Sequence, residues 1–79
     1  MKINVKSYHE LRSLTAGLPQ DGQMELVAGD TVRTVLTRLT VSSQKLPTLA
    51  LFVNGRMARL ETPLQPGDTL TFFSPLTGG

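Results

Sequence analysis

The chain has 79 residues, enough for one domain with one modest core. Hydrophobic residues make up 39% of it and charged residues 18%, which is the balance of a globular protein rather than a disordered one. The net charge is only +2 and no run of basic residues occurs, so nucleic acid is not expected as a partner. The absence of cysteine excludes a disulfide framework, a thiolate nucleophile and a zinc site built on cysteine.

The amino end does not resemble an export signal or a membrane anchor. Its first eight residues, MKINVKSY, alternate polar and apolar side chains and lack the apolar core of a signal peptide. No segment approaches the roughly 20 apolar residues that a membrane-spanning helix needs. We therefore expect a cytoplasmic protein without a membrane partner.

The first part of the chain alternates between strand and helix patterns. Period-two alternation predicts a half-buried strand at residues 2–7. In residues 8–17, YHELRSLTAG, Leu11 and Leu14 lie one helical turn apart, which predicts a short helix. After turn residues, QMELV predicts a second strand at residues 23–27.

The main helix is expected to begin after Gly29, with Thr31 as its N-cap. Its apolar residues fall at i, i+3, i+4 and i+7, which places them on one stripe: Val32, Val35, Leu36 and Leu39. Residues 42–47 are interpreted as a polar connection, because Pro47 cannot continue the helix.

Residues 48–60, TLALFVNGRMARL, predict a hairpin around Asn54-Gly55, a pair that suits the two positive φ angles of a type I′ turn. A further turn leads to a last strand at residues 69–73, in which alternate side chains should face opposite sides. The expected fold class is α+β, with one mixed sheet of about five strands and the main helix across one face. A parallel pairing of the first and last strands is compatible with this pattern.

A conventional active site is not apparent in the sequence. His9 is the only histidine, the carboxylates are scattered, and no glycine-rich phosphate loop or nucleophile elbow occurs. We predict no catalytic residue and no metal site, and we expect that the chain is not an enzyme.

Phe52 and Phe73 suggest an interaction surface instead. They fall on neighbouring strands and are expected on the sheet face that the main helix leaves open, next to the end of the chain. The alternative is a register shifted by one residue, which would place both rings in the core.

The sequence ends in SPLTGG, which we interpret as a flexible tail at residues 74–79 after a domain at residues 1–73. Pro75 favours an extended backbone, and Gly78 and Gly79 lack side chains, so this segment could pass through a narrow channel. A free carboxylate becomes an acyl donor only when it is activated, for example as an acyl-adenylate made with ATP. The carboxylate of Gly79 is therefore the candidate reactive group.

Residues 51–79 resemble the MoaD/ThiS family of ubiquitin-like, β-grasp sulfur carriers and, within it, MoaD, the small subunit of molybdopterin synthase. The shared pattern is PLxxGDxLxFFxPxxGG, present here as Pro63-Leu64, Gly67-Asp68, Leu70, Phe72-Phe73, Pro75 and Gly78-Gly79. Ser74 stands where the family often has a first proline. The amino half agrees more loosely, through YHELRSLTAG and GDTVRTVLTRL.

The resemblance implies a β-grasp fold and a carrier mechanism without a bound cofactor. An E1-like adenylyltransferase, similar to MoeB or ThiF, would use ATP to adenylate the Gly79 carboxylate. Sulfur from a cysteine desulfurase or a rhodanese would then give a thiocarboxylate. A large subunit resembling MoaE would accept the loaded tail, and the sulfur would pass to the pterin that holds molybdenum or tungsten.

Matching positions also imply contact residues. The tail residues expected to enter the partner's groove are Pro75, Leu76, Thr77 and Gly78. The expected partner surface consists of Phe52 and Phe73, with Arg56 and Arg59 as polar contacts.

Three alternatives stay open at this point. The chain could carry sulfur to another acceptor, such as the thiazole of thiamine, as ThiS does. It could be a protein modifier that forms isopeptide bonds through Gly79. It could also be a plain binding module with an inert tail.

Overall fold

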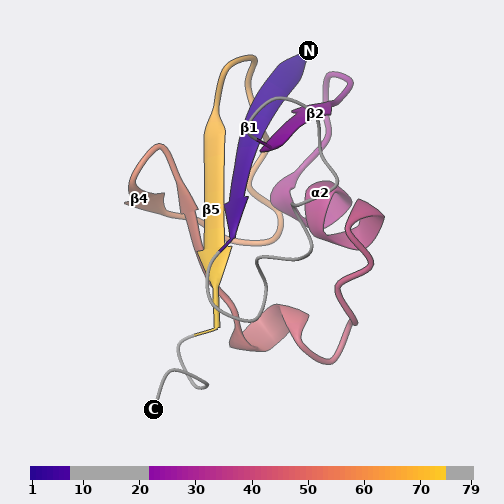
Figure 1. Cartoon of the computed structure of the whole chain (residues 1–79), viewed down its shortest axis with the longest axis vertical. Coiled ribbons are helices and arrows are strands. Elements are labelled where there is room, and N and C mark those ends of the chain that lie inside the picture. Colours follow the sequence, from indigo (N-terminus) through magenta and orange to yellow (C-terminus); the bar gives the residue numbers. More distant parts are fainter. Residues whose placement is uncertain (8–21, 75–79) are drawn as a thin grey trace.

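The computed structural model describes residues 1–7 and 22–74, and Figure 1 shows how their elements are arranged. The strands and helices in chain order are β1 (Lys2–Ser7), β2 (Gln23–Glu25), α2 (Val32–Arg38), the short 3-10 helix η2 (Leu46–Thr48), β3 (Ala50–Val53), β4 (Arg56–Met57) and β5 (Thr69–Phe73). The short helix expected at residues 8–17 and the tail beyond residue 74 lie outside the described residues. The α+β, β-grasp architecture is the one that the sequence predicts.

The five strands form one mixed sheet in the order β2-β1-β5-β3-β4. β1 and β5 are parallel, with Val5 opposite Leu70, whereas the other neighbours are antiparallel. The parallel pairing of the first and last strands is confirmed. β5 is the central strand, because two strands lie on each side of it.

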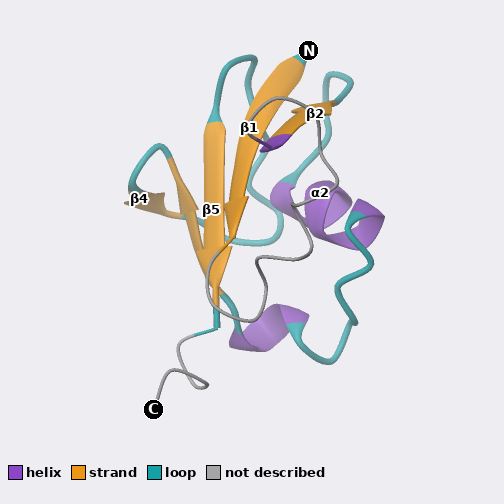
Figure 2. Ribbon diagram, in the orientation of Figure 1, coloured by secondary structure: helices purple, strands orange, loops and turns teal. Residues whose placement is uncertain are grey.

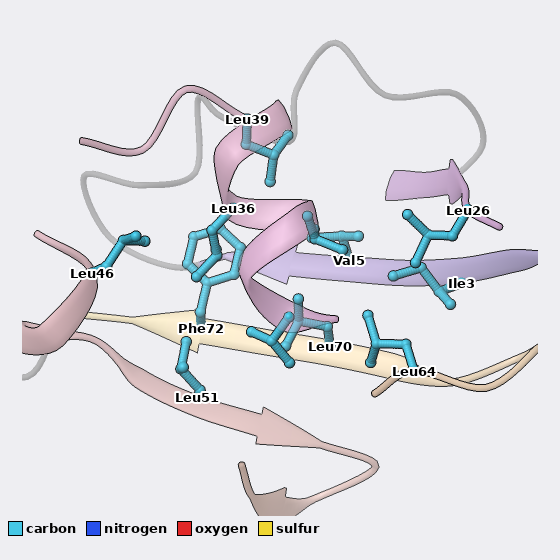
Figure 3. Close-up of a cluster of buried hydrophobic side chains, with 12 residues drawn as sticks. Ile3, Val5, Leu26, Leu36, Leu39, Leu46, Leu51, Leu64, Leu70 and Phe72 are labelled. Atoms are coloured by element: carbon cyan, nitrogen blue, oxygen red, sulfur yellow. The ribbon is translucent and has the colours of Figure 1, made fainter. Parts of the chain in front are cut away.

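The core lies between the sheet and α2, which covers one of its faces (Figure 2). The alternation in β5 sends Leu70 and Phe72 into this core, where both are fully buried. Figure 3 shows Phe72 reaching toward Leu36 of the helix, with Val5 beside it. The predicted helix stripe is confirmed, since all four of its residues are buried.

The start of α2 is bonded to the segment that returns from the hairpin. The first N–H groups of a helix have no partner within it. The Val32 amide donates to the Thr62 carbonyl over 3.1 Å, and the Arg33 amide donates to the Leu60 carbonyl over 2.9 Å. The Arg33 guanidinium also pairs with Glu61 at 2.6 Å. These contacts hold the helix across the sheet.

The hairpin turn has the predicted geometry, with φ of 54° at Asn54 and 82° at Gly55. The Asn54 side chain ties this turn to the beginning of β5. Its Nδ2 donates to Asp68 Oδ1 over 2.8 Å, and its Oδ1 accepts from the Thr69 amide over 2.9 Å. The hairpin is thereby fixed against the central strand.

The predicted bounds of the second strand are wrong, and the structure adds detail to the connection at residues 42–47 and to the hairpin. β2 ends at Glu25 and not at Val27, because the Val27 amide leaves the ladder and donates to Asp30 Oδ2. The connection at residues 42–47 is not wholly polar or irregular, since η2 buries Leu46. The second strand of the hairpin stops at Met57, after which the chain turns towards the helix.

None of the helices within residues 22–74 is long and apolar enough to cross a membrane.

Gly22 has no room for a side chain, because a Cβ there would lie 2.3 Å from the Val5 carbonyl oxygen. Gly29 has a similar positive φ, 94° against 84°, but a Cβ there meets nothing within 4 Å. Both Gly→Ala variants should lose about 1–2 kcal/mol of unfolding free energy, because a residue with a Cβ is strained at a positive φ. Gly22→Ala should lose about 1–3 kcal/mol more because of the overlap.

Urea denaturation of the two variants measures this difference. Equal losses for Gly22→Ala and Gly29→Ala would contradict the close approach of the chain before β2 to β1.

Candidate functional site

The sheet face opposite α2 carries the aromatic pair that the sequence predicts. Phe52 and Phe73 stack with their ring centroids 5.9 Å apart and their planes within 6° of parallel. Phe52 lies opposite Thr71 and Phe73 lies opposite Ala50, so the two rings meet diagonally across β3 and β5. Both are half-buried, whereas Leu51 and Phe72 beside them are core residues. The shifted register is therefore wrong, while the role of the pair as a partner surface stays a prediction.

Lys6 and Met57 also lie on this face, and sequence reasoning did not count them as contact residues. Lys6 lies opposite Thr71 across β1 and β5, and Met57 lies opposite Phe52 across β3 and β4. Met57 is 84% exposed. Counting outward from the two-residue turn pairs residue 52 with residue 57, so Met57 could have been found. The position of Lys6 depends on the parallel register, which no local pattern specifies.

Arg56 and Arg59 are exposed, as the sequence suggests, but neither lies in the row of side chains that contains the aromatic pair. Arg56 lies opposite Val53, which packs against the core. Arg56 and Met57 are successive strand residues, so their side chains leave opposite faces of the sheet. Arg59 follows the end of β4, where its amide donates to Thr62 Oγ1. Their predicted polar contacts with a partner stay a prediction.

The acidic side chains in residues 22–74 are all engaged. The four pairs are Glu25 with the Met1 ammonium, Asp30 with Arg38, Glu61 with Arg33, and Asp68 with Asn54. The hydrogen bond from the Met1 ammonium lowers the pKa of the exposed Glu25 carboxyl, although desolvation opposes it. These carboxylates are occupied in holding the fold.

Five cations stand outside these ion pairs. Within residues 1–7 and 22–74, no ion pair joins a carboxylate to Lys2, Lys6, Lys45, Arg56 or Arg59. All five are exposed. The described surface is consequently left with positive charge that faces solvent.

A shallow hollow of about 530 Å³ lies beside β4. It is lined by Val53, Asn54, Arg56, Met57, Ala58 and Thr62. The guanidinium of Arg56 is the one ionisable group in this lining, so the hollow offers no acid–base pair. Within the described ranges, no group of three or more acidic or histidine side chains could hold a metal ion.

β5 ends at Phe73, and Ser74, the first residue of the predicted tail, is the last described residue. The structure does not describe His9, the predicted tail residues Pro75, Leu76, Thr77 and Gly78, or Gly79, whose carboxylate is the predicted reactive group. The stacked ring of Phe73 thus belongs to the residue directly before the predicted tail. The division into a domain and a tail, and the roles of the tail residues, stay predictions.

The fold has counterparts among solved structures. Two structures of SAMP1, small archaeal modifier protein 1, from Haloferax volcanii are similar to this chain. The first has a TM-score of 0.76 at 20% identity and covers 100% of both chains. The second has a TM-score of 0.74 at 17% identity and covers 94% of this chain and 97% of that one. A protein assigned as molybdopterin converting factor, subunit 1, from Pyrococcus furiosus has a TM-score of 0.71 at 24% identity, covering 95% of this chain and 98% of that one. These matches show a shared fold.

A third counterpart comes from a complex of subunits 1 and 2 of molybdopterin-converting factor from Helicobacter pylori 26695. It has a TM-score of 0.58 at 19% identity over the full length of both chains. No curated protein sequence matches this chain.

The sequence itself matches one family model, that of the ThiS family, over residues 6–79. The match includes the aromatic pair, the turn before β5 and the terminal glycines. This chain therefore belongs to the ThiS family of ubiquitin-like sulfur carriers.

Proposed function

We propose that this chain is a MoaD-type sulfur carrier that supplies the sulfur of molybdopterin through the carboxylate of Gly79. The observation that supports it most is the family match, which runs from residue 6 through the terminal glycines. The PLxxGDxLxFFxPxxGG pattern supports the MoaD type in particular. Similarity to the subunit 1 structures from Pyrococcus furiosus and Helicobacter pylori supports it as well.

In this proposal the chemistry takes place at the end of the chain. An E1-like adenylyltransferase of the MoeB or ThiF type lets the Gly79 carboxylate attack ATP, and pyrophosphate leaves. A persulfide supplied by a cysteine desulfurase or a rhodanese then displaces AMP from the acyl carbon. Cleavage of the S–S bond by a thiol leaves the thiocarboxylate. The chain binds no cofactor of its own, since ATP is a substrate of the activating enzyme.

The folded domain has a separate task, which is recognition. The carrier must be accepted first by the activating enzyme and then by a large subunit of the MoaE type, and the Phe52–Phe73 stack is the proposed contact for both. Subunit 1 of the Helicobacter pylori protein was solved in complex with a subunit 2, which supports a partner of that kind. Pro75, Leu76, Thr77 and Gly78 would enter the partner's groove.

A second candidate is a modifier that joins Gly79 to lysine side chains of other proteins. The similarity to small archaeal modifier protein 1 supports it. Transfer of sulfur to thiazole, as in ThiS, is a third possibility within the same family. Supplying the loaded carrier with a pterin precursor or a thiazole precursor in parallel separates the two carrier readings.

The Gly79→Ala variant tests the reactive end. The added methyl group would crowd the activation channel and displace the carboxylate, so adenylation should fall by on the order of 100-fold. The unfolding free energy should stay unchanged. Carrier-dependent ATP–pyrophosphate exchange with the E1-like enzyme measures the first quantity and urea denaturation the second. Near-normal exchange and thiocarboxylate yield would overturn the proposal.

Phe73 and Phe72 form a matched pair, because they are adjacent and face opposite sides of the sheet. Phe73→Ala should cost about 2 kcal/mol or more in binding free energy to the activating enzyme, as truncation of an aromatic anchor does. Phe72→Ala should instead cost about 3–5 kcal/mol of unfolding free energy, since its ring is fully buried.

Isothermal titration calorimetry and urea denaturation of both variants give the two numbers. If Phe73→Ala were to lose stability as Phe72→Ala does while keeping its affinity, the stacked pair would be part of the fold rather than the contact.

A further inference from the structure

The open face of the sheet carries a continuous row that runs across four strands. From β1 to β4 its members are Lys6, Thr71, Phe52 and Met57, each paired with the next in the sheet register. Paired residues point to the same face of a sheet, so these four side chains lie side by side. Phe73 joins the row by stacking on Phe52. We call these five residues the open-face row.

The row has an apolar end and a basic end. Phe52, Phe73 and Met57 form the apolar end, and Met57 at 84% exposure is the least covered of them. Lys6 forms the basic end, two strand spacings or about 10 Å from Phe52. Thr71 separates the two ends with a small side chain. The surface therefore presents an apolar anchor and a positive charge at a fixed separation.

The charge of this face is not balanced within the described residues. Their four carboxylates all have other partners, and Lys6 forms no ion pair in residues 1–7 and 22–74. A second copy of the chain would bring no carboxylate from the described residues that is free to pair with Lys6. A partner with carboxylates around an apolar groove would instead complement both ends of the row.

We propose that the open-face row, with Lys6 and Met57 as its outer contacts, docks a partner protein whose apolar groove is rimmed on one side by Asp or Glu. This inference rests on the proposed function and identifies that partner as the E1-like adenylyltransferase. Met57 enters the groove beside the aromatic stack, and Lys6 pairs with the acidic rim. Lys6 and Met57 thereby set which partner is accepted, while the tail supplies the reacting group.

Lys6 has a matched control in Lys45. Both are exposed lysines without an ion pair in the described residues, but Lys45 precedes η2 and lies outside the sheet. Lys6→Glu and Lys45→Glu change the net charge by the same amount. Lys6→Glu should raise the KM for the carrier about tenfold in pyrophosphate exchange and leave kcat unchanged, because it removes a contact of the docked complex. Lys45→Glu should leave both within about twofold.

The contact of Met57 is tested by comparing a small apolar substitute with one of similar size. Met57→Ala should raise the KM for the carrier several-fold, whereas Met57→Leu should keep the wild-type KM. Because Met57 is an exposed residue of an edge strand, both variants should fold like the wild type, which circular dichroism and urea denaturation check.

The outcomes distinguish a failure of the proposed function from a failure of the open-face row alone. If the wild-type chain is not adenylated at all, the proposed function fails and this inference fails with it. If the wild type is adenylated but Lys6→Glu and Lys45→Glu change KM equally, only general charge attraction operates and the open-face row is overturned. A change confined to Lys6 and Met57 supports it.

Discussion

The parallel pairing of β1 with β5 is the constraint on which the rest of the molecule depends. It joins the two ends of the described chain and makes β5 the central strand. Its register sets which side chains of β5 enter the core, and a slip of one residue would exchange Phe72 with Phe73. Leu70 and Phe72 are fully buried under α2, so such a slip would cost most of the apolar burial at the centre of the core. The position of the exposed stack is thus a consequence of core packing.

The same constraint separates two tasks within a small domain. One sheet face holds the helix and gives stability, while the other presents the open-face row. The acidic residues in the described part serve the fold, in particular through Arg33–Glu61 and Asn54–Asp68. Chemistry in the proposed function takes place at the carboxylate of Gly79, so the folded domain needs recognition groups rather than an acid–base pair. The family match accords with this division, because it spans both the domain and the last residues.

The sequence correctly predicted the elements in which apolar residues recur at a regular helix or strand spacing. The helix stripe and the alternation in β5 follow from the spacing of apolar residues, and the turn follows from the Asn54-Gly55 pair. The errors lie where a side chain replaces a backbone bond, as when Asp30 accepts the Val27 amide and ends β2. They also lie where a short segment buries a single residue, as η2 does with Leu46. Lys6 was missed for a third reason, since its neighbours are set by a pairing between the two ends of the chain.

Intact mass of the protein from its native cells tests the carrier account most directly. The account predicts a species about 16 Da heavier than the sequence mass, from exchange of sulfur for oxygen at Gly79. Oxidation of a methionine adds about the same mass, and Met57 is exposed, so fragmentation must place the gain in the peptide that contains Gly79. Deleting Gly79 should abolish it. A plain carboxylate in every free molecule, together with larger conjugates joined through Gly79 to lysines of other proteins, would contradict the carrier account and establish a modifier.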